Sequence, residues 1–360
     1  MNRIIKILLL EDSPEDVQKL RRILGEIDSV QFELVPVEHL TEALPHLLRN
    51  RFDLILTDLS LPASQGLDTI SNIASKITNI PIVVLTGAHD DMTGLEAVRR
   101  GAQDYLDKAQ LNPSMLLRVI RYSIERKKLE NVKEDFIGMV SHELRTPLAV
   151  IREGVSQVLD RICGPINDSQ RQCLNLSLNH VDRLTRIISN LLDISRIEAG
   201  KLNLTQELHD VAVLAEEAIA FLSPIIKDKR LRIKVDFPKE REKINVDKDR
   251  IIQVFTNLIG NALKFTEKGH IQVIVVNRKE GIECSVADTG KGIDKEDVPK
   301  LFSKFQQFGR VVGPGEKGTG LGLSIVKGIV ELHKGDISVE SRVNKGTKFT
   351  FILPKGRTDL

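Results

Sequence analysis

The sequence predicts a multidomain α/β protein, with a doubly wound parallel sheet first, a helical hairpin next and an α/β sandwich last. Three observations lead to this fold class. The chain has 360 residues, which is more than one hydrophobic core usually holds. Up to about residue 112, short apolar runs alternate with amphipathic stretches, and two long segments with helical periodicity follow. From about residue 208, strand-like runs return in an order that favours antiparallel strands with helices on one face.

Acidic and basic side chains nearly cancel, leaving a net charge of +2, so no large single-sign field favours a nucleic acid or a membrane surface as partner. The apolar opening, Ile4–Leu10, leads directly into Glu11 and Asp12, which is typical of a buried strand rather than a signal sequence. No later segment reaches the roughly 18 apolar residues of a membrane span. We therefore expect a soluble, cytoplasmic protein whose three cysteines, which lack metal-type spacing, are free thiols.

Five strands are predicted in the first domain, because each is a short apolar run that alternates with an amphipathic stretch. They are Ile4–Leu10, Phe32–Val37, Leu54–Thr57, Ile82–Leu85 and Asp104–Leu106. In a parallel sheet the carboxyl ends of the strands meet at one edge, so ligand chemistry is expected at that edge.

Chemically active side chains follow these strands at their carboxyl ends. Glu11 and Asp12 follow the first strand, Asp58 the third, Thr86 the fourth and Lys108 the fifth. Crowded carboxylates need a cation, and hard oxygen ligands suit Mg²⁺, so the three acids are the predicted metal ligands. Asp58 is the central candidate for a nucleophile that forms an acyl phosphate, with Thr86 and Lys108 binding the phosphoryl oxygens.

About 112 residues of this part resemble the response-regulator receiver family. The matching motifs are Leu10-Glu-Asp-Ser-Pro14, Leu56-Thr-Asp-Leu-Ser-Leu-Pro62, Val84-Leu-Thr-Gly87 and Tyr105-Leu-Asp-Lys108. The resemblance implies a flavodoxin-like receiver domain in which Asp58 is the phosphoacceptor.

The same resemblance implies roles for the other residues at this edge of the sheet. Glu11 and Asp12 would be magnesium-site acids, Thr86 and Tyr105 switch residues, and Lys108 the phosphoryl partner. Ala109 stands where many receivers have proline, and a non-proline cis peptide costs about 3 kcal/mol, so the loop there is expected to differ. The alternative is a degenerate receiver whose acids are merely solvated, but no ligand position is missing.

Pro113 begins a long helical stretch that meets no further proline until Pro147. Its charged middle and slipped apolar stripe predict a helical connector over 126–135, with an ordinary solvated helix as the alternative. Two apolar-striped helices follow, separated by a turn in which Asp168 can cap the second helix. Because neither helix can bury its stripe alone, we expect residues 136–204 to dimerise into a four-helix bundle.

One histidine lies on the outer face of the first hairpin helix. The apolar stripe on the other face runs through Phe136, Val140, Leu144, Leu148, Ile151, Val155, Val158 and Ile162. His142 falls roughly 200° from Val140 around the helix, so its imidazole is expected to be accessible to a large partner. A neutral imidazole is a good nucleophile, and the adjacent Glu143 can accept a proton from the other ring nitrogen.

The segment Ser141-His-Glu-Leu-Arg-Thr-Pro-Leu148 resembles the phosphoacceptor box of histidine kinase dimerisation domains. The resemblance implies that His142 is autophosphorylated and that Glu143 is its acid–base partner. Thr146 matches the position that orients water for dephosphorylating a partner receiver, so phosphatase activity is compatible with the sequence. Pro147 cannot donate to the helix ladder, so a kink is expected beside the phosphoacceptor.

The last domain combines a polar helix face with two glycine-rich turns. Asn257, Asn261 and Lys264 share one helix face at spacings of four and three residues, which suits Mg²⁺ and phosphate oxygens but is also typical of a solvated face. The turns are Asp288-Thr-Gly-Lys-Gly292 and Gly318-Thr-Gly-Leu-Gly-Leu-Ser324. The second opens an apolar helix, whose first backbone amides can bind phosphate.

Together these motifs resemble the ATP-binding domain of histidine kinases over about residues 208 to 356. The resemblance implies that Asn257 binds magnesium, that Lys264 lies near phosphate and that Asp288 binds the adenine amino group. The residues implied at the nucleotide are Asn257, Asn261, Lys264, Asp288, Gly290, Gly292, Gly318, Thr319, Gly320, Leu321, Gly322 and Thr347. The glycine-rich stretch 306–317 is predicted to be a lid over ATP, with a plain surface loop as the alternative.

The sequence therefore predicts an ATP-dependent histidine kinase of a two-component pathway, autophosphorylated on His142 and regulated through Asp58. The expected domains are 1–125 (receiver), 126–135 (connector), 136–204 (dimerisation and phosphotransfer) and 208–356 (ATP binding). Expected partners are a second copy of the chain, a receiver domain in this or another protein, and an upstream kinase acting on Asp58. A non-enzymatic adaptor would have lost site residues, and a chaperone- or gyrase-like ATPase would not explain the box around His142.

Overall fold

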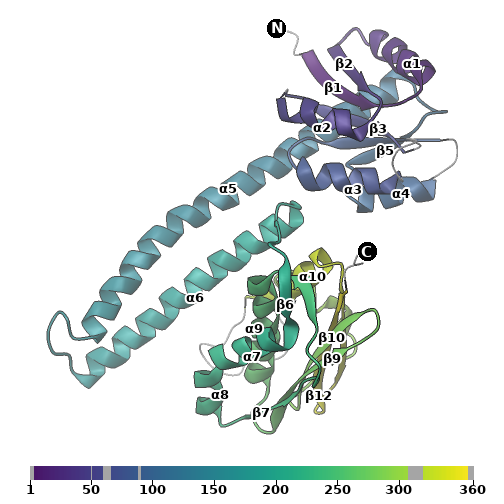
Figure 1. Ribbon diagram of the computed structural model, residues 1–360. Coiled ribbons are helices and arrows are strands. Elements are labelled where there is room, and N and C mark those ends of the chain that lie inside the picture. Colours follow the sequence, from purple (N-terminus) through teal and green to yellow (C-terminus); the bar gives the residue numbers. More distant parts are fainter. Residues whose placement is uncertain (1–3, 50, 60–65, 88–90, 307–318, 356–360) are drawn as a thin grey trace. The chain divides into compact units, whose positions relative to one another are not determined.

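The computed structural model describes residues 4–49, 51–59, 66–87, 91–306 and 319–355 (Figure 1). The chain divides into two compact units. The first comprises residues 1–139 with 199–201, and the second comprises residues 140–198 with 202–360.

The first unit is built around a five-stranded sheet with the order β2-β1-β3-β4-β5, in which all neighbouring strands are parallel. The strands are β1 (Ile4–Leu10), β2 (Gln31–Val37), β3 (Leu54–Asp58), β4 (Ile82–Thr86) and β5 (Asp104–Asp107). Each strand begins and ends within one residue of the range expected from the sequence. The predicted doubly wound parallel sheet is therefore confirmed.

Helices cover both faces of this sheet (Figure 1). One face packs against α1 (Pro14–Gly25) and the first part of α5 (Pro113–Leu159), where Leu20 and Ile120 are buried. The other face packs against α2 (Leu40–Arg49), α3 (Leu67–Lys76) and α4 (Asp91–Arg99). With apolar cores on both faces, the central strands β3 and β4 are buried along their whole length, as parallel strands usually are.

Two long helices form the predicted hairpin: α5, which contains Pro147 in its interior, and α6 (Asp168–Glu198). The predicted cap of α6 is wrong by one residue. Asn167 fills that position, because its side-chain oxygen accepts from the Gln170 amide at 2.8 Å while the Gln170 side chain accepts from the Asn167 amide at 2.9 Å. This reciprocal pair satisfies amides that the helix start leaves unpaired, and Asp168 is the first helical residue.

The second unit carries another five-stranded sheet, in the order β11-β12-β10-β9-β7, and a two-stranded β6–β8 pair. The strands are β6 (Glu207–Asp210), β7 (Arg232–Asp236), β8 (Lys243–Val246), β9 (His270–Asn277), β10 (Gly281–Asp288), β11 (Asp336–Arg342) and β12 (Gly346–Pro354). Neighbouring strands are antiparallel, as expected, except that β7 and β9 are parallel.

A layer of helices packs on one face of this second sheet (Figure 1). It contains α7 (Val211–Phe221), α9 (Lys248–Phe265) and α10 (Gly322–Leu332), and the short helices α8 (Ser223–Lys229) and η1 (Val298–Lys300) lie between the larger elements in the chain. Phe255 of α9 and Phe351 of β12 are fully buried and meet edge to face at 5.3 Å between ring centroids. The unit is thus the predicted sandwich of one sheet and one helix layer.

Candidate functional site

Three acids meet at the carboxyl edge of the first sheet, and we call them the acid cluster: Glu11, Asp12 and Asp58. Glu11 and Asp12 follow β1 directly, and Asp58 is the last residue of the neighbouring strand β3. One ligand oxygen from each acid lies within 4.8 Å of the others, and Glu11 and Asp58 are buried. Burial raises the pKa of Glu11, although the hydrogen bond from Lys108 favours its charged form. Such a set of hard oxygen ligands fits a divalent cation like Mg²⁺.

Lys108, in the loop after β5, supplies the positive charge of this site. Its Nζ lies 2.7 Å from Glu11 Oε2, 2.9 Å from Asp58 Oδ2 and 2.7 Å from Asp16 Oδ2. Burial opposes the charge on Lys108, but the hydrogen bonds to Asp16, Glu11 and Asp58 outweigh it and raise the Lys108 pKa. The ammonium is therefore a fixed cation within reach of the candidate nucleophile.

Asp16 was not among the residues singled out in the sequence. It lies in the first turn of α1, where acids are ordinary because they complement the helix dipole, so its position alone gave no functional signal. A pairing with Lys108 across 92 positions of the chain depends on how α1 packs against the sheet. Only the folded structure reveals that contact.

The two predicted switch residues belong to the neighbouring strands β4 and β5. Thr86 is buried at the end of β4, and its hydroxyl donates to the Leu106 carbonyl at 3.4 Å. The Tyr105 ring lies against Gly94 of α4, so closely that a Cβ there would come within 2.4 Å of a ring carbon. The Lys108–Ala109 peptide is trans, and the Ala109 amide donates to Asp107 Oδ1 at 2.8 Å, which gives the loop its own local support.

His142 lies in α5 and projects into solvent, as predicted from the helix periodicity. Its side chain is 78% exposed and that of Glu143 is 76% exposed. His142 Nδ1 lies 3.5 Å from Glu143 Oε1, which leaves Nε2 facing away from this carboxylate. Thr146, one turn further along the helix, is also exposed. The histidine thus has a neighbouring base on one ring nitrogen and an accessible second nitrogen.

The apolar stripe of the hairpin is only partly covered in a single chain. Leu144, Ile151 and Ile162 of α5 and its following turn are at least 45% exposed, as are Leu176 and Leu184 of α6. Isolated apolar side chains on a surface are ordinary, but a stripe of them along two long helices indicates a missing packing partner.

The polar face of α9 meets the second glycine-rich turn at the start of α10. A Cβ on Gly322 would lie 3.3 Å from Asn257 Oδ1, so the Asn257 amide packs against the backbone of that turn. Gly320 has φ of 72°, and its carbonyl accepts from the Phe305 amide at 3.1 Å. A side chain at Gly320 would collide with the backbone of Phe305 and Gln306, so glycine is required here. Thr319 accepts from the Leu321 amide at 3.2 Å and closes the turn.

Asp288, at the end of β10, lies among the other predicted adenine-site residues. Its carboxylate accepts from the backbone amides of Gly290, at 2.7 Å, and Thr347. Burial raises the Asp288 pKa even though both amides favour the charged form. Thr347 is itself buried, and its hydroxyl lies 2.8 Å from Ser341 Oγ, a support that the sequence did not single out.

The remaining predicted nucleotide residues fall into three groups. Asn261 and Lys264 follow Asn257 on α9, and the Lys264 ammonium lies 5.1 Å from the Phe265 ring centroid. Gly292 has φ of 68° and lies against the Arg342 carbonyl, in the first glycine-rich turn. Gly318 and nearly all of the predicted lid lie outside the described residues.

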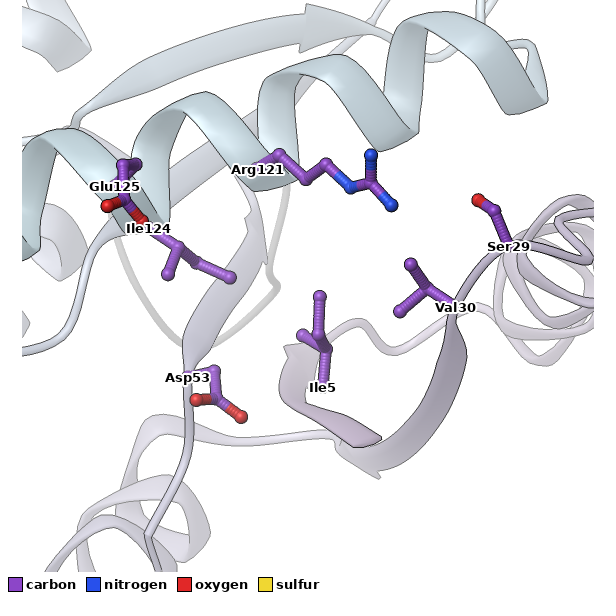
Figure 2. Close-up of a pocket in the computed structure, with 7 residues that line it drawn as sticks. All are labelled: Ile5, Ser29, Val30, Asp53, Arg121, Ile124 and Glu125. Carbon is purple, nitrogen blue, oxygen red and sulfur yellow. The ribbon is translucent and has the colours of Figure 1, made fainter. Parts of the chain in front are cut away.

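A hollow in the described part of the chain lies elsewhere (Figure 2). Its lining combines the amino ends of strands with α5: Ile5, Ser29, Val30, Asp53, Arg121, Ile124 and Glu125. In Figure 2 the Arg121 guanidinium points across it towards Ser29. This hollow is at the sheet edge opposite to the acid cluster, and it does not gather convergent catalytic groups, so it is not the candidate site.

Among the helices of the described residues, none has both the length and the apolar content that crossing a membrane requires.

Three family models match the chain in succession. The response regulator receiver domain matches residues 7–121, and the His Kinase A (phospho-acceptor) domain matches residues 132–200. The family of histidine kinase-, DNA gyrase B- and HSP90-like ATPases matches residues 246–357. Each match covers one of the regions described above.

Similar proteins point in the same direction. The non-motile and phage-resistance protein of Caulobacter vibrioides is 32% identical over 294 residues, covering 77% of this chain and 35% of that protein. Sensor protein SrrB of Staphylococcus aureus is 34% identical over 253 residues, covering 70% of this chain and 43% of that protein. The crystal structure of full-length ShkA in complex with AMPPNP has 27% identity and a TM-score of 0.53, covering 61% of this chain and 45% of that one. The chain spans less than half the length of each of these relatives.

The three family models occur in the order that the motifs predicted, and the described folds agree with them. The predicted resemblance to receiver domains and to histidine kinases is therefore confirmed. The chain belongs to the histidine kinases of two-component signalling, as a hybrid kinase with its receiver domain on the N-terminal side.

Proposed function

We propose that this protein uses ATP to phosphorylate itself on His142 and then passes the phosphoryl group to a receiver aspartate. The observation that carries the proposal is the exposed His142–Glu143 pair, with Nδ1 and Oε1 3.5 Å apart, in a chain that also contains the Asn257–Gly322 and Asp288–Thr347 clusters. The proposed boundaries are 1–125 for the receiver, 126–135 for the connector, 136–204 for dimerisation and phosphotransfer, and 208–356 for ATP binding.

In the first step, His142 Nε2 forms a bond to the γ-phosphorus of ATP while the bond from that phosphorus to the bridging oxygen breaks, and ADP leaves. Glu143, placed beside Nδ1, accepts the Nδ1 proton as charge develops on the ring. A separation of 3.5 Å is long for a hydrogen bond, and such contacts commonly tighten when substrate is bound. Positioning and charge neutralisation supply most of the catalysis in phosphoryl transfer.

On the nucleotide side, Asp288 would accept from the adenine amino group, and its carboxylate is supported by the Thr347 amide. The turn from Thr319 to Gly322, with its backbone amides at the start of α10, is placed to bind phosphate oxygens. Asn257 would hold a magnesium ion, Asn261 would line the same nucleotide site, and Lys264 would lie near the phosphates. Magnesium would neutralise phosphate charge at this site and at the acid cluster of the receiver.

In the second step, a carboxylate oxygen of the receiver aspartate forms a bond to phosphorus as the P–N bond of phosphohistidine breaks, and the departing imidazole takes up a proton. Asp58 is the acceptor in this chain, and Glu11 and Asp12 complete its magnesium site. Phosphate reaches Asp58 from His142 or from a different kinase, and we favour a regulatory role in cis because α5 begins in the receiver and contains His142. A receiver in a separate protein is the alternative acceptor.

The exposed stripe on α5 and α6 supports a homodimer formed through residues 136–204. Two such hairpins would bury their stripes in a four-helix bundle. Thr146, exposed one turn beyond His142, would orient a water molecule towards a phosphorylated receiver and so give phosphatase activity.

The test is labelling with ATP that carries radioactive γ-phosphate, in the wild type, His142→Gln and Asp58→Asn. Wild-type label should be stable in base and labile in acid, as expected for phosphohistidine, and should disappear in His142→Gln. In Asp58→Asn it should persist on histidine. Acid-labile, base-stable label in His142→Gln would refute the assignment of His142.

A further inference from the structure

Helix α1 contacts Lys108 at both ends of that residue. At the side-chain end, Asp16 Oδ2 lies 2.7 Å from Lys108 Nζ. At the backbone end, Lys19 Nζ donates to the Lys108 carbonyl at 2.8 Å. Asp16 and Lys19 lie one turn apart on α1, so one helix face holds the residue that faces the candidate phosphoacceptor.

The hydrogen bonds of the Lys108 ammonium explain why a second acceptor, Asp16, matters in addition to Glu11. An ammonium has three N–H donors, and Lys108 uses them on Glu11, Asp16 and Asp58. Asp16 lies outside the three-acid group whose oxygens could hold a metal ion. With Glu11 and Asp16 accepting two of the N–H bonds, the third is directed at Asp58. A lysine held only by Glu11 could rotate about its long side chain and lose this direction.

Asp16 is itself held in place by the start of α1. Its amide donates to Ser13 Oγ at 3.3 Å, and the Ser13 amide donates to Glu11 Oε1 at 3.2 Å. Behind this turn, Leu20, Ile23 and Leu24 are buried against the sheet. Packing of α1 against the sheet therefore holds Asp16 in a fixed position.

We infer that Asp16, assisted by Lys19, is a positioning residue for Asp58 phosphorylation: it fixes the Lys108 ammonium so that it can bind the incoming phosphoryl group. The inference rests on the proposed role of Asp58 as phosphoacceptor. When the phosphoryl group bonds to Asp58, the third N–H of Lys108 passes from the Asp58 carboxylate to a phosphoryl oxygen. Asp16 and Glu11 keep the other two throughout.

The test measures phosphorylation of Asp58 in the full-length chain by radiolabelled acetyl phosphate with saturating Mg²⁺ and without ATP. Asp16→Ala should lower the maximal rate about tenfold, because a displaced catalytic group loses orientation. Asp16→Asn, which keeps the shape and an oxygen acceptor, should lie between it and the wild type, and Asp16→Glu should restore at least half of the rate. Lys19→Met should lower the rate about threefold.

Two measurements separate positioning from general damage. Glu15→Ala and Arg21→Met change exposed neighbours on the same helix and should leave the rate within twofold of wild type. Calorimetric titration with Mg²⁺ should give an affinity within threefold of wild type in Asp16→Ala, because Asp16 is not one of the three clustered acids.

The positioning role is refuted if Asp16→Ala is phosphorylated at the wild-type rate, or if Glu15→Ala is slowed as much. It is also refuted if the whole loss in Asp16→Ala comes from weaker Mg²⁺ binding. Should Asp16→Ala fail to fold, the same criteria apply to Asp16→Asn. Asp58→Asn serves as the blank: wild type that takes up no more label than this blank would overturn the role of Asp58 itself, and the inference with it.

Discussion

The two candidate phosphoacceptors of this chain are built in opposite ways. Asp58 is buried at a strand end, and Lys108 of the same sheet edge bonds to it at 2.9 Å. His142 is 78% exposed on a helix and has one neighbouring carboxylate, that of Glu143. A preformed positive charge suits an aspartate that is proposed to accept a phosphoryl group, and exposure suits a histidine that is proposed to meet both ATP and a receiver.

Removing the positive charge of Lys108 should give the largest effect on stability. Lys108→Met leaves Glu11, Asp16 and Asp58 without their common partner, so the receiver should lose about 3 kcal/mol of unfolding free energy. This is the low end for a buried pair, because the Lys108 side chain keeps 18% exposure. Urea denaturation followed by circular dichroism measures the loss.

Magnesium should change the stability of Lys108→Met and of the wild type by different amounts. The ion should restore more stability to Lys108→Met than it adds to the wild type, because it replaces the missing positive charge at the acid cluster. No shift in Lys108→Met would show that the acids do not form a cation site, and an equal shift in both proteins would show that Lys108 does not compete with the ion.

The contact between α4 and Tyr105 should give the next largest effect. Gly94→Ala places a methyl group against the Tyr105 ring, so the ring or the helix must shift, at a cost of about 1 to 2 kcal/mol. Gly154→Ala is the matched control, since open space surrounds that helical glycine and alanine should stabilise it by about 1 kcal/mol.

The chain has two tyrosines, so the ring signals of labelled tyrosine in NMR spectra resolve the movement directly. In Gly94→Ala the Tyr105 signal should move and the Tyr122 signal should stay. An unmoved Tyr105 signal together with a more stable protein would contradict the contact.

A buried histidine provides a contrast to His142. His333 Nε2 accepts from the Asp247 amide at 3.0 Å, and its Nδ1 lies 2.8 Å from the Ile329 carbonyl, so the ring is neutral with its proton on Nδ1. Burial lowers the His333 pKa. The unfolded state therefore binds a proton first as pH falls below about 6.5, and the stability that neutral His333 provides is lost on further acidification.

The matching experiment compares unfolding free energies at pH 7.5, 6.5 and 5.5. His333 should add a downward slope towards acid of at most about 1.4 kcal/mol per pH unit, and His333→Gln should remove that contribution. A variant with the same pH dependence as the wild type would show that His333 does not titrate on unfolding.

The smallest expected effect is on the exposed phosphoacceptor. His142→Gln should change the unfolding free energy by less than about 0.5 kcal/mol, because substitutions of exposed side chains rarely do more. A larger change would mean that His142 is packed in the folded protein and would weaken the contrast with Asp58.

Much of this molecule could be predicted from sequence patterns. The receiver strands were found within one residue because each is a short apolar run that ends in polar residues, and β3 and β4 have no exposed face to blur the signal. The outward position of His142 followed from helix periodicity alone. Acids that follow β1 and β3 had to meet because the carboxyl ends of parallel strands share an edge.

The features that could not be predicted depend on long-range packing or on weak local signals. The contact between Asp16 and Lys108 joins α1 to the loop after β5, and no sequence pattern in either segment predicts it. The β6–β8 pair was missed because both strands have only four residues and β6 contains a single apolar residue. The cap of α6 was placed on Asp168 because Asn and Asp are equally good caps, and only the reciprocal bonds with Gln170 identify Asn167.

Autophosphorylation on His142 is tested most directly by locating the phosphoryl group itself. Asp58→Asn, incubated with ATP and Mg²⁺, would be digested at neutral pH and its peptides sequenced by mass spectrometry under conditions that preserve phosphohistidine. We predict one phosphoryl group, on His142, and none in the double variant His142→Gln, Asp58→Asn. A phosphoryl group on any other residue, or an unmodified His142 beside hydrolysed ATP, would contradict the account.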